Sequence, residues 1–269
     1  MPNLDVVAVQ IASSLDPAEN REAMGILDSI CTGRPRPDLV VLPEAVMCDF
    51  GPPGTDISEF AEDLDGPFVQ RLEELAAKLE VTVVAGMFER SADPERPFNT
   101  LVVVDRDGLR ATYRKIHLYD SFGYKESDRL LAGEPDPVVV KVGGLQVGLM
   151  TCYDLRFPEM ARALVDRGAE VLVVPAAWVA GPLKVEHWRT LLTARAIENT
   201  VYVVAAAQPG PRYSGHSMVV SPRGERLELD EQDEQAEEAA RGVVVSSRVE
   251  REYLDEVRAE NPSLANRRL

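Results

Sequence analysis

Cysteine is scarce in this chain, and its copies lie far apart. Cys31, Cys48 and Cys152 are odd in number, and their wide gaps suit neither a disulfide framework nor paired metal ligands. The three histidines are equally scattered and make a poor zinc set. We therefore expect a protein of a reducing compartment, the cytoplasm, without a bound metal.

Long apolar runs and positive charge are also lacking. No segment approaches the roughly 18 apolar residues that span a bilayer, and residues 1–10 lack the basic region of a secretion signal. Lys and Arg number 29 against 45 Asp and Glu, a net charge of -16 that repels phosphate backbones and anionic lipid. We therefore expect no nucleic-acid or membrane partner. Part of the acidic excess, at 225–238, is interpreted as a solvated hairpin and loop.

The remaining composition is that of an ordinary globular protein. Hydrophobic residues make up 45% of the 269 residues and charged residues 28%, which is enough apolar material for a core. No Gly/Ser/Pro-rich linker divides the chain into two apolar halves. We predict one domain over residues 1–269.

Strand-like segments recur along the whole chain and are mostly apolar throughout, which predicts burial on both faces. These segments are Val6–Ile11, Leu39–Leu42, Val81–Phe88, Leu101–Val104, Val138–Val142, Val147–Met150, Val171–Val174, Val201–Ala206, Met218–Val220 and Val243–Val245. A helical period replaces the strand pattern at 68–79, and similar stripes occur at 23–30 and 188–196. The alternation predicts an α/β fold in which two packed sheets are covered by helices.

Three ionisable residues follow predicted strands, where α/β sheets gather their ligands. Glu44 follows the strand at 39–42, Cys152 follows the strand at 147–150, and Lys115 comes after the strand that begins near Leu101. A cysteine that attacks a carbon–nitrogen bond needs a base for its proton and a positive charge beside the forming oxyanion. Glu44 is the candidate base, and Lys115 is the candidate charge.

Each of these residues also has a simpler interpretation. Cys152 alone is a small buried hydrophobe, Glu44 a cap or ion-pair residue, and Lys115 a surface lysine. The segment after Cys152 favours the catalytic interpretation of this residue, because Pro158 and Glu159 suit the first turn of a helix. A thiol on that turn would meet a positive helix end, which favours the thiolate.

Six short motifs resemble, in order and separation, the signatures of the nitrilase superfamily. They are Leu42-Pro-Glu44, Arg114-Lys-Ile-His117, Cys152-Tyr-Asp-Leu-Arg-Phe-Pro-Glu159, His187-Trp188, Arg195-Ala-Ile-Glu-Asn199 and Ser214-Gly-His-Ser217. The resemblance covers nearly the full length and implies a four-layer αββα sandwich, a Glu-Lys-Cys triad and no cofactor. It also implies a homodimer, with the C-terminal tail at about 250–269 lying at the subunit contact.

The resemblance further implies a second glutamate that orders the triad lysine and the substrate. Glu126 is the best positional match, although a loop ion pair is the alternative interpretation. In the implied mechanism Glu44 takes the thiol proton, Cys152 attacks an amide carbon, and Lys115 and the Tyr153 N–H meet the oxyanion. A thioester forms, ammonia leaves, and water activated by Glu44 releases the acid.

The motif at 152–159 looks closer to the amidase branches than to nitrilases. Small aliphatic amides and ω-amides, including those of 2-oxo acids and deaminated glutathione, are the leading substrate class. Arg156 either binds a substrate carboxylate or pairs with Asp154 or Glu159. Tyr119, Tyr153 and Trp178 either line the pocket or belong to the core.

Other activities share these residues. A nitrilase or an N-carbamoyl amino acid hydrolase would use the same triad, and an acyltransferase would resolve the thioester with an amine. A catalytically silent assembly scaffold is the non-enzymatic alternative, which the intact Glu44, Lys115 and Cys152 disfavour. The histidines His117, His187 and His216 are interpreted as structural, because none has an evident partner that would orient a catalytic imidazole.

Overall fold

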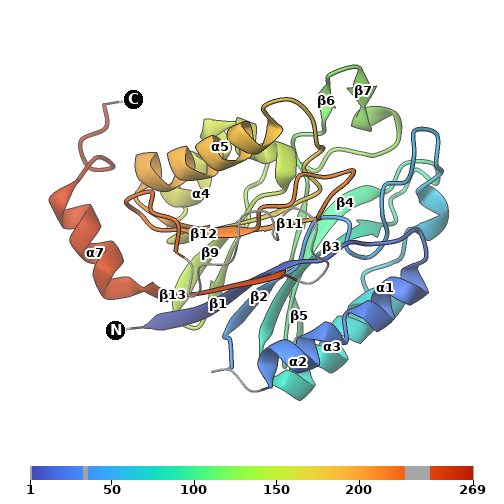
Figure 1. The fold of residues 1–269 in the computed structure, drawn as a ribbon, viewed down its shortest axis with the longest axis horizontal. Helices are drawn as coiled ribbons and strands as arrows, with labels where there is room; N and C mark the ends of the chain where they lie inside the picture. The colour runs from blue at the N-terminus through green and yellow to red at the C-terminus, as the bar shows by residue number, and fades with distance from the viewer. Residues whose placement is uncertain (1, 33–35, 228–242, 269) are drawn as a thin grey trace.

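Two β-sheets pack face to face and are covered by helices on their outer sides (Figure 1). The computed structural model describes residues 2–32, 36–227 and 243–268. The six-stranded sheet has the order β13 (Val243–Glu250), β1 (Asn3–Gln10), β2 (Leu39–Val41), β3 (Thr82–Glu89), β4 (Phe98–Asp105), β5 (Gly108–Arg114). The five-stranded sheet has the order β12 (Met218–Val220), β11 (Tyr202–Ala207), β10 (Val171–Ala176), β9 (Leu145–Leu149), β8 (Val139–Val142). The four-layer αββα architecture is confirmed.

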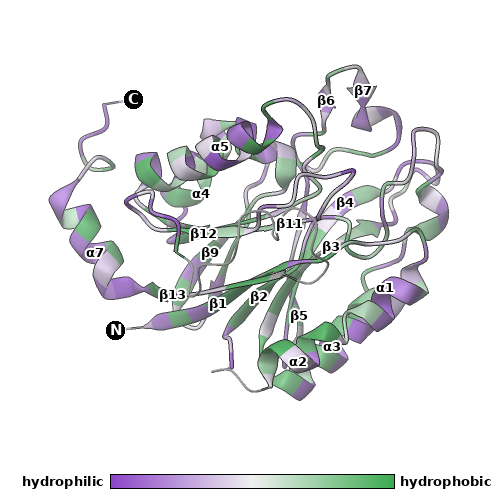
Figure 2. Ribbon diagram, viewed as in Figure 1, coloured by the Kyte–Doolittle hydropathy of each residue, from purple (hydrophilic) through white to green (hydrophobic). Residues whose placement is uncertain are grey.

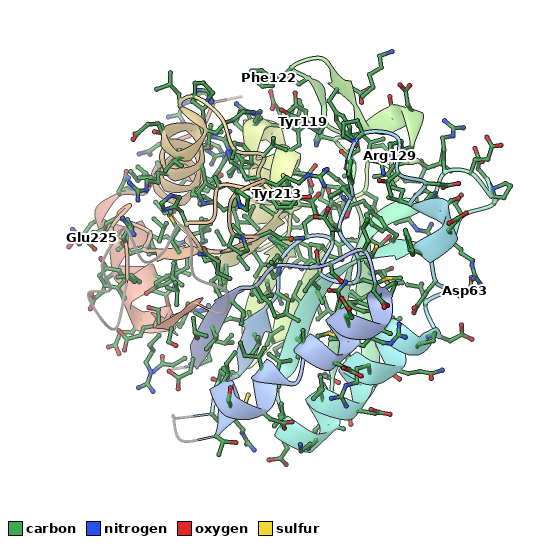
Figure 3. All side chains as sticks on the ribbon, turned by 45° about the vertical axis from the view of Figure 1, so that its right-hand side comes forward. Asp63, Tyr119, Phe122, Arg129, Tyr213 and Glu225 are labelled. Carbon is green, nitrogen blue, oxygen red and sulfur yellow. The ribbon has the colours of Figure 1, made fainter. Side chains whose placement is uncertain are left out.

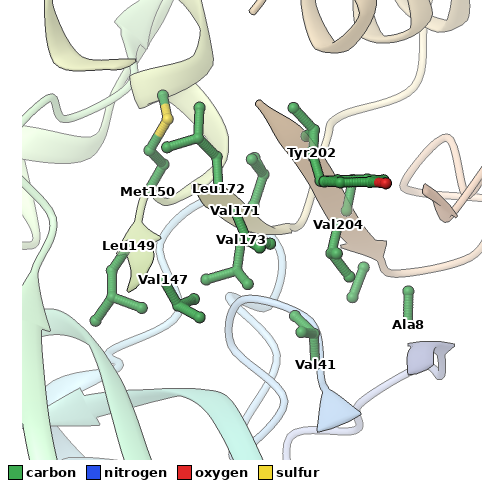
Figure 4. Packing of buried hydrophobic residues seen from close by; sticks show 14 of the residues in the cluster. Ala8, Val41, Val147, Leu149, Met150, Val171, Leu172, Val173, Tyr202 and Val204 are labelled. Atoms are coloured by element: carbon green, nitrogen blue, oxygen red, sulfur yellow. The ribbon is translucent and has the colours of Figure 1, made fainter. Parts of the chain in front are cut away.

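Both faces of the central strands are buried, which explains why their sequences are apolar throughout. In β1, Val6 and Ala8 face the core between the sheets, whereas Val7 and Val9 face the helices. This alternation follows from the two-residue period of a strand. Figure 4 shows side chains of β9, β10 and β11 meeting those of Ala8 and Val41 between the two sheets.

Helices form the outer layers. The six-stranded sheet is covered by α1 (Pro17–Ala23), α2 (Ile26–Cys31) and α3 (Pro67–Leu79). The five-stranded sheet is covered by α4 (Pro158–Asp166) and α5 (Lys184–Asn199). Figure 2 shows hydrophilic and hydrophobic colours mixed on these helices, whereas the central strands are mainly hydrophobic. Helices with one apolar face therefore shield strands that are apolar on both.

The structure corrects three details of the expected order. The helical stripe at 23–30 is divided between α1 and α2, with a turn between them. The strand β5 was not expected, because its side chains are mostly half-buried and partly polar. The helix α7 (Arg251–Glu260) lies in the tail, where only a subunit contact was expected, and buries Leu254 and Val257.

Most of the acidic segment predicted as a hairpin, at 228–238, lies outside the described residues. Its first part does form an antiparallel bridge, between Val220 and Arg226. No helix in the described part of the chain is long and apolar enough to cross a membrane.

Candidate active site

Three loops at the strand ends bring the predicted residues together. Glu44 follows β2, and Cys152 opens the short 3-10 helix η3 (Cys152–Arg156) after β9. Lys115 directly follows β5. Lys115 was expected to follow the strand beginning near Leu101, and the structure places one further strand, β5, between the two. The chain forms the antiparallel β4–β5 hairpin and reaches Lys115 only after β5, which is an edge strand of the same sheet.

Lys115 joins two buried carboxylates. Its Nζ lies 2.9 Å from Oε1 of Glu44 and 2.9 Å from Oε2 of Glu126, and all three side chains are at most 2% exposed. Burial alone would lower the pKa of Lys115, but the carboxylates of Glu126 and Glu44 outweigh it and hold that pKa well above its usual value. The lysine is thus a fixed positive charge.

Glu126 lies at the start of the short 3-10 helix η2 (Glu126–Asp128) and accepts hydrogen bonds from three groups. These are Lys115, the backbone N–H of Tyr119 at 2.5 Å, and the side-chain amide of Asn99 at 3.4 Å. Burial raises the pKa of Glu126, Lys115 opposes this rise, and Glu44 adds to it. Glu126 was expected to act on Lys115, and the structure brings the two side chains into contact.

Two groups that sequence analysis did not identify hold Glu44. The side-chain amide of Asn99, on β4, donates to Oε1 of Glu44 at 2.7 Å. The backbone N–H of Ala177, just after β10, donates to Oε2 at 2.7 Å. Both oxygens of Glu44 are therefore engaged from different sheets. An asparagine inside a strand and a backbone amide leave no sequence signal that points to a site 55 or more residues away.

Cys152 occupies a strained turn. Its φ of 43° lies in the left-handed region, which residues other than glycine adopt at a cost. The residue is 7% exposed and lines the cavity described below. Burial, followed by the carboxylate of Glu44 and a hydrogen bond to it, holds the pKa of Cys152 well above its usual value. This upward shift opposes the thiolate that the helix end was expected to favour.

A buried carboxylate ties the cysteine turn to the lysine segment. Asp154 accepts from the Thr151 backbone N–H at 2.8 Å and from the Tyr113 hydroxyl at 2.7 Å. Its other oxygen lies 2.7 Å from Nδ1 of His117. Tyr113 and His117 flank Lys115 in the sequence, so the Asp154 side chain fixes the positions of the Cys152 turn and the lysine together.

A cavity of about 450 Å³ opens from this cluster toward the surface. Its wall contains the four side chains predicted to contact substrate together with several that were not predicted. The predicted four are Tyr119, Tyr153, Arg156 and Trp178, and the others include Phe50, Phe122, Tyr124, Lys184, Arg212 and Tyr213. Figure 3 places Tyr119 and Phe122 beside the short hairpin of β6 (Asp120–Ser121) and β7 (Tyr124–Lys125).

Arg156 does not make the structural pair that was its alternative interpretation. Among the described residues no carboxylate lies within ion-pair distance of it, and Asp154 is engaged elsewhere. Trp178 is 3% exposed yet lines the cavity, so it is both core and wall. Within the described ranges, no set of three His, Cys, Asp or Glu side chains is placed to hold a metal ion.

Comparison with known proteins identifies the class. The sequence matches the carbon-nitrogen hydrolase family over residues 6–259, and the chain belongs to that family. It is 40% identical to a deaminated glutathione amidase of Escherichia coli O157:H7, over 86% of this chain and 84% of the relative. It is 34% identical to a 2-oxoglutaramate amidase of Paenarthrobacter nicotinovorans, over 98% of this chain and 90% of that protein.

Solved structures agree with this class. A CN-hydrolase superfamily protein of Xanthomonas campestris, crystallised with an arsenic adduct in its active site, superimposes with a TM-score of 0.85 at 31% identity. The alignment covers 100% of this chain and 98% of that one. The chain is thus a nitrilase-superfamily enzyme that hydrolyses carbon–nitrogen bonds other than peptide bonds, and the relatives' names support amide hydrolysis.

Proposed function

We propose that Glu44, Lys115 and Cys152 form the catalytic triad of a small-molecule amidase that works through a thioester on Cys152. The observation that carries this proposal is the convergence of a thiol, a carboxylate and an ammonium on the wall of one cavity. Hydrolysis of an amide by a cysteine enzyme needs a nucleophile, a base and a positive charge beside the oxyanion.

In the first half of the reaction Glu44 takes the thiol proton as sulfur attacks the amide carbon. The charge that develops on the amide oxygen meets Lys115 and the backbone N–H of Tyr153, which lies in the first turn of η3, where N–H groups have no partner within the helix. Protonated Glu44 then gives its proton to the leaving nitrogen. Ammonia departs, and the acyl group remains on sulfur.

In the second half, Glu44 removes a proton from water as the water oxygen attacks the thioester. The carbon–sulfur bond breaks, the acid leaves, and the thiol is restored with a proton from Glu44. Glu126 acts as a positioning residue, because its contacts with Lys115 and the Tyr119 N–H hold the ammonium in place.

The proposed substrates are small aliphatic amides and ω-amides. Support comes from the size of the cavity and from the two amidases to which the chain is similar, one named for deaminated glutathione and one for 2-oxoglutaramate. Tyr119, Tyr153, Arg156 and Trp178 are the proposed substrate contacts. A primary ω-amide would place its nitrogen near Glu44 and its remaining atoms along the aromatic wall.

The test is ammonia release from a panel of small amides, nitriles and N-carbamoyl amino acids, with the carbon products identified. We expect amides to be hydrolysed and Cys152→Ala to lose all detectable turnover while keeping its melting temperature. Rapid acid quench followed by peptide mass spectrometry should find the acyl group on Cys152. Cys48→Ala, which removes another buried thiol, is the matched control and should retain activity.

Each other outcome points to a different reaction. Nitrile conversion to acid would replace amide hydrolysis with nitrilase activity, and carbon dioxide release would indicate a carbamoylase. Acyl products formed only when an amine is added would indicate acyl transfer. Full activity in Cys152→Ala would overturn the covalent route.

We also propose a cytoplasmic homodimer with one domain per chain. All three cysteines are free, which suits a reducing compartment. The tail after α7 is mostly exposed and is tied back through Arg267 and Asp166, so it lies on the surface where a second copy could contact it. Sedimentation of the whole chain and of a variant ending at residue 260 tests the dimer, which only the whole chain should form.

A further inference from the structure

Two positive side chains lie together on the cavity wall. Arg156 ends η3, and Lys184 is the first residue of α5. The Arg156 guanidinium carbon lies 4.9 Å from the Trp178 ring centre, and Lys184 Nζ lies 5.8 Å from the same ring. Both also approach Phe122, at 6.0 Å and 3.9 Å respectively. The two cations therefore share one aromatic environment.

Neither cation has a carboxylate partner among the residues that the structure describes. The two carboxylates on the cavity wall, Glu44 and Glu126, are both bonded to Lys115. Nε of Arg156 is buried without a hydrogen-bond partner in the described part of the molecule. Lys184 is 8% exposed, and its Nζ donates to the neutral hydroxyl of Tyr119 at 3.1 Å.

Another cation on the wall, Arg212, gives a useful contrast. Arg212 is paired with Asp49 at 2.6 Å, and Asp49 also accepts from the Tyr213 hydroxyl at 2.6 Å. That part of the wall is neutralised from within the protein. The part formed by Arg156 and Lys184 is not, although the chain as a whole has 16 more acidic than basic residues.

Two like charges held close together in a half-buried pocket repel each other. Burial, followed by the charge of Arg156, lowers the pKa of Lys184. An anion between the two side chains would remove that repulsion. A carboxylate suits this position, because the planar guanidinium can donate two parallel hydrogen bonds and the ammonium a third.

We propose that Arg156 and Lys184 together bind a carboxylate of the substrate at the far side of the cavity from the reacting amide, and that Lys184 determines the preference for such substrates. The proposal rests on the proposed amidase function and narrows its substrate class to amides that carry a negative charge. Cys152, Arg156 and Lys184 all line the same cavity, so one small molecule bound there would face both the sulfur and the cations.

The experiment compares two amides of equal length. One is glutaramate, and the other is its neutral analogue with a hydroxymethyl group in place of the carboxylate. We expect wild-type protein to prefer glutaramate and Lys184→Met to lower the ratio of the two kcat/KM values by about 10- to 100-fold, mainly through KM, because a desolvated charge contact is lost. Lys184→Arg should restore most of the ratio. Lys78→Met, at an exposed lysine on α3, is the matched control and should leave it unchanged.

Two results would overturn the inference while leaving the amidase proposal intact. The first is a wild-type enzyme that hydrolyses both amides equally well, and the second is a Lys184→Met variant whose ratio does not change. A second measurement needs no turnover: calorimetric binding of glutarate to Cys152→Ala, with and without Lys184→Met. Glutarate binding that depends on Lys184 supports the anion site even if neither amide reacts, and absent or unchanged binding refutes it.

Discussion

At the scale of single residues, the surroundings of Cys152 oppose ionisation of its thiol. Burial and the Glu44 carboxylate both raise the pKa of Cys152, and Lys115 only partly opposes them. In the proposed mechanism the thiol therefore loses its proton as the substrate is attacked, with Glu44 as the acceptor. This distinguishes the site from one that uses a helix end to store a thiolate.

A titration of alkylation tests this arrangement. In wild-type protein the rate at which iodoacetamide modifies Cys152 should rise with pH to a midpoint above the usual range of a cysteine. Glu44→Gln removes a negative charge beside the sulfur, so the pKa falls and the midpoint should move to lower pH. Peptide mass spectrometry separates Cys152 from Cys31 and Cys48. An unchanged or higher midpoint in the variant would contradict this explanation.

Removal of the lysine should affect folding as well as catalysis. Lys115→Met leaves two buried carboxylates without their cation, and breaking a buried pair from one side costs about 3–5 kcal/mol. We expect an inactive variant with a lower free energy of unfolding in denaturant titration. Adding Glu126→Gln removes one unpaired charge and should recover part of the stability, but not the activity. Equal stability of the single and double variants would show that Glu126 does not respond to the lysine charge.

At the scale of elements, a close contact between β3 and the segment that carries Glu44 fixes the base. A Cβ on Gly86 would lie 2.6 Å from the backbone nitrogen of Ala45 and 2.8 Å from Cα of Glu44. Both distances are too short, and the atoms that would have to move belong to the backbone. Glycine is required at this position in β3 so that the loop after β2 can lie against the strand.

Gly86→Ala should therefore displace Glu44 and lower kcat by about 10²-fold, since small misplacements of catalytic groups have effects of this size. The matched control is Gly148→Ala in β9, whose added Cβ would meet only side-chain carbons, at 3.1 Å. That variant should lose stability but keep more of its kcat. The measurements are steady-state kinetics and thermal unfolding. A Gly86→Ala variant with normal kcat would mean that the Glu44 loop moves without consequence.

The elements that were predicted from sequence share one property: the residues of each element show by themselves which of its faces are buried. Strands buried on both faces appear as apolar runs, and an amphipathic helix such as α3 appears as a stripe. The edge strand β5 mixes polar and apolar residues, so its pattern resembles a loop. The cluster of Glu44, Lys115 and Cys152 was predictable from short motifs, but Asn99 and Lys184 were not, because each joins the site only when distant elements pack together.

At the scale of the whole molecule, the long-range field and the local field of the cavity have opposite signs. The net charge of -16 repels an anionic substrate at a distance, whereas Arg156 and Lys184 attract its carboxylate on contact. Salt weakens the long-range repulsion more than the local attraction in the cavity. Exposed charges are screened beyond about 10 Å at 0.1 M salt, but half-buried contacts are screened much less.

Raising the ionic strength should therefore increase kcat/KM for glutaramate and leave kcat/KM for its neutral hydroxymethyl analogue unchanged. The expected gain is about 2- to 10-fold between low and physiological salt, at the lower end of steering effects, because only the unfavourable long-range part is removed. Initial rates at low substrate concentration measure it directly. A fall in kcat/KM with salt would mean that the positive pocket already dominates at a distance. Lys184→Met then distinguishes the two fields, since it should weaken glutaramate binding at every salt concentration without changing the sign of the salt effect.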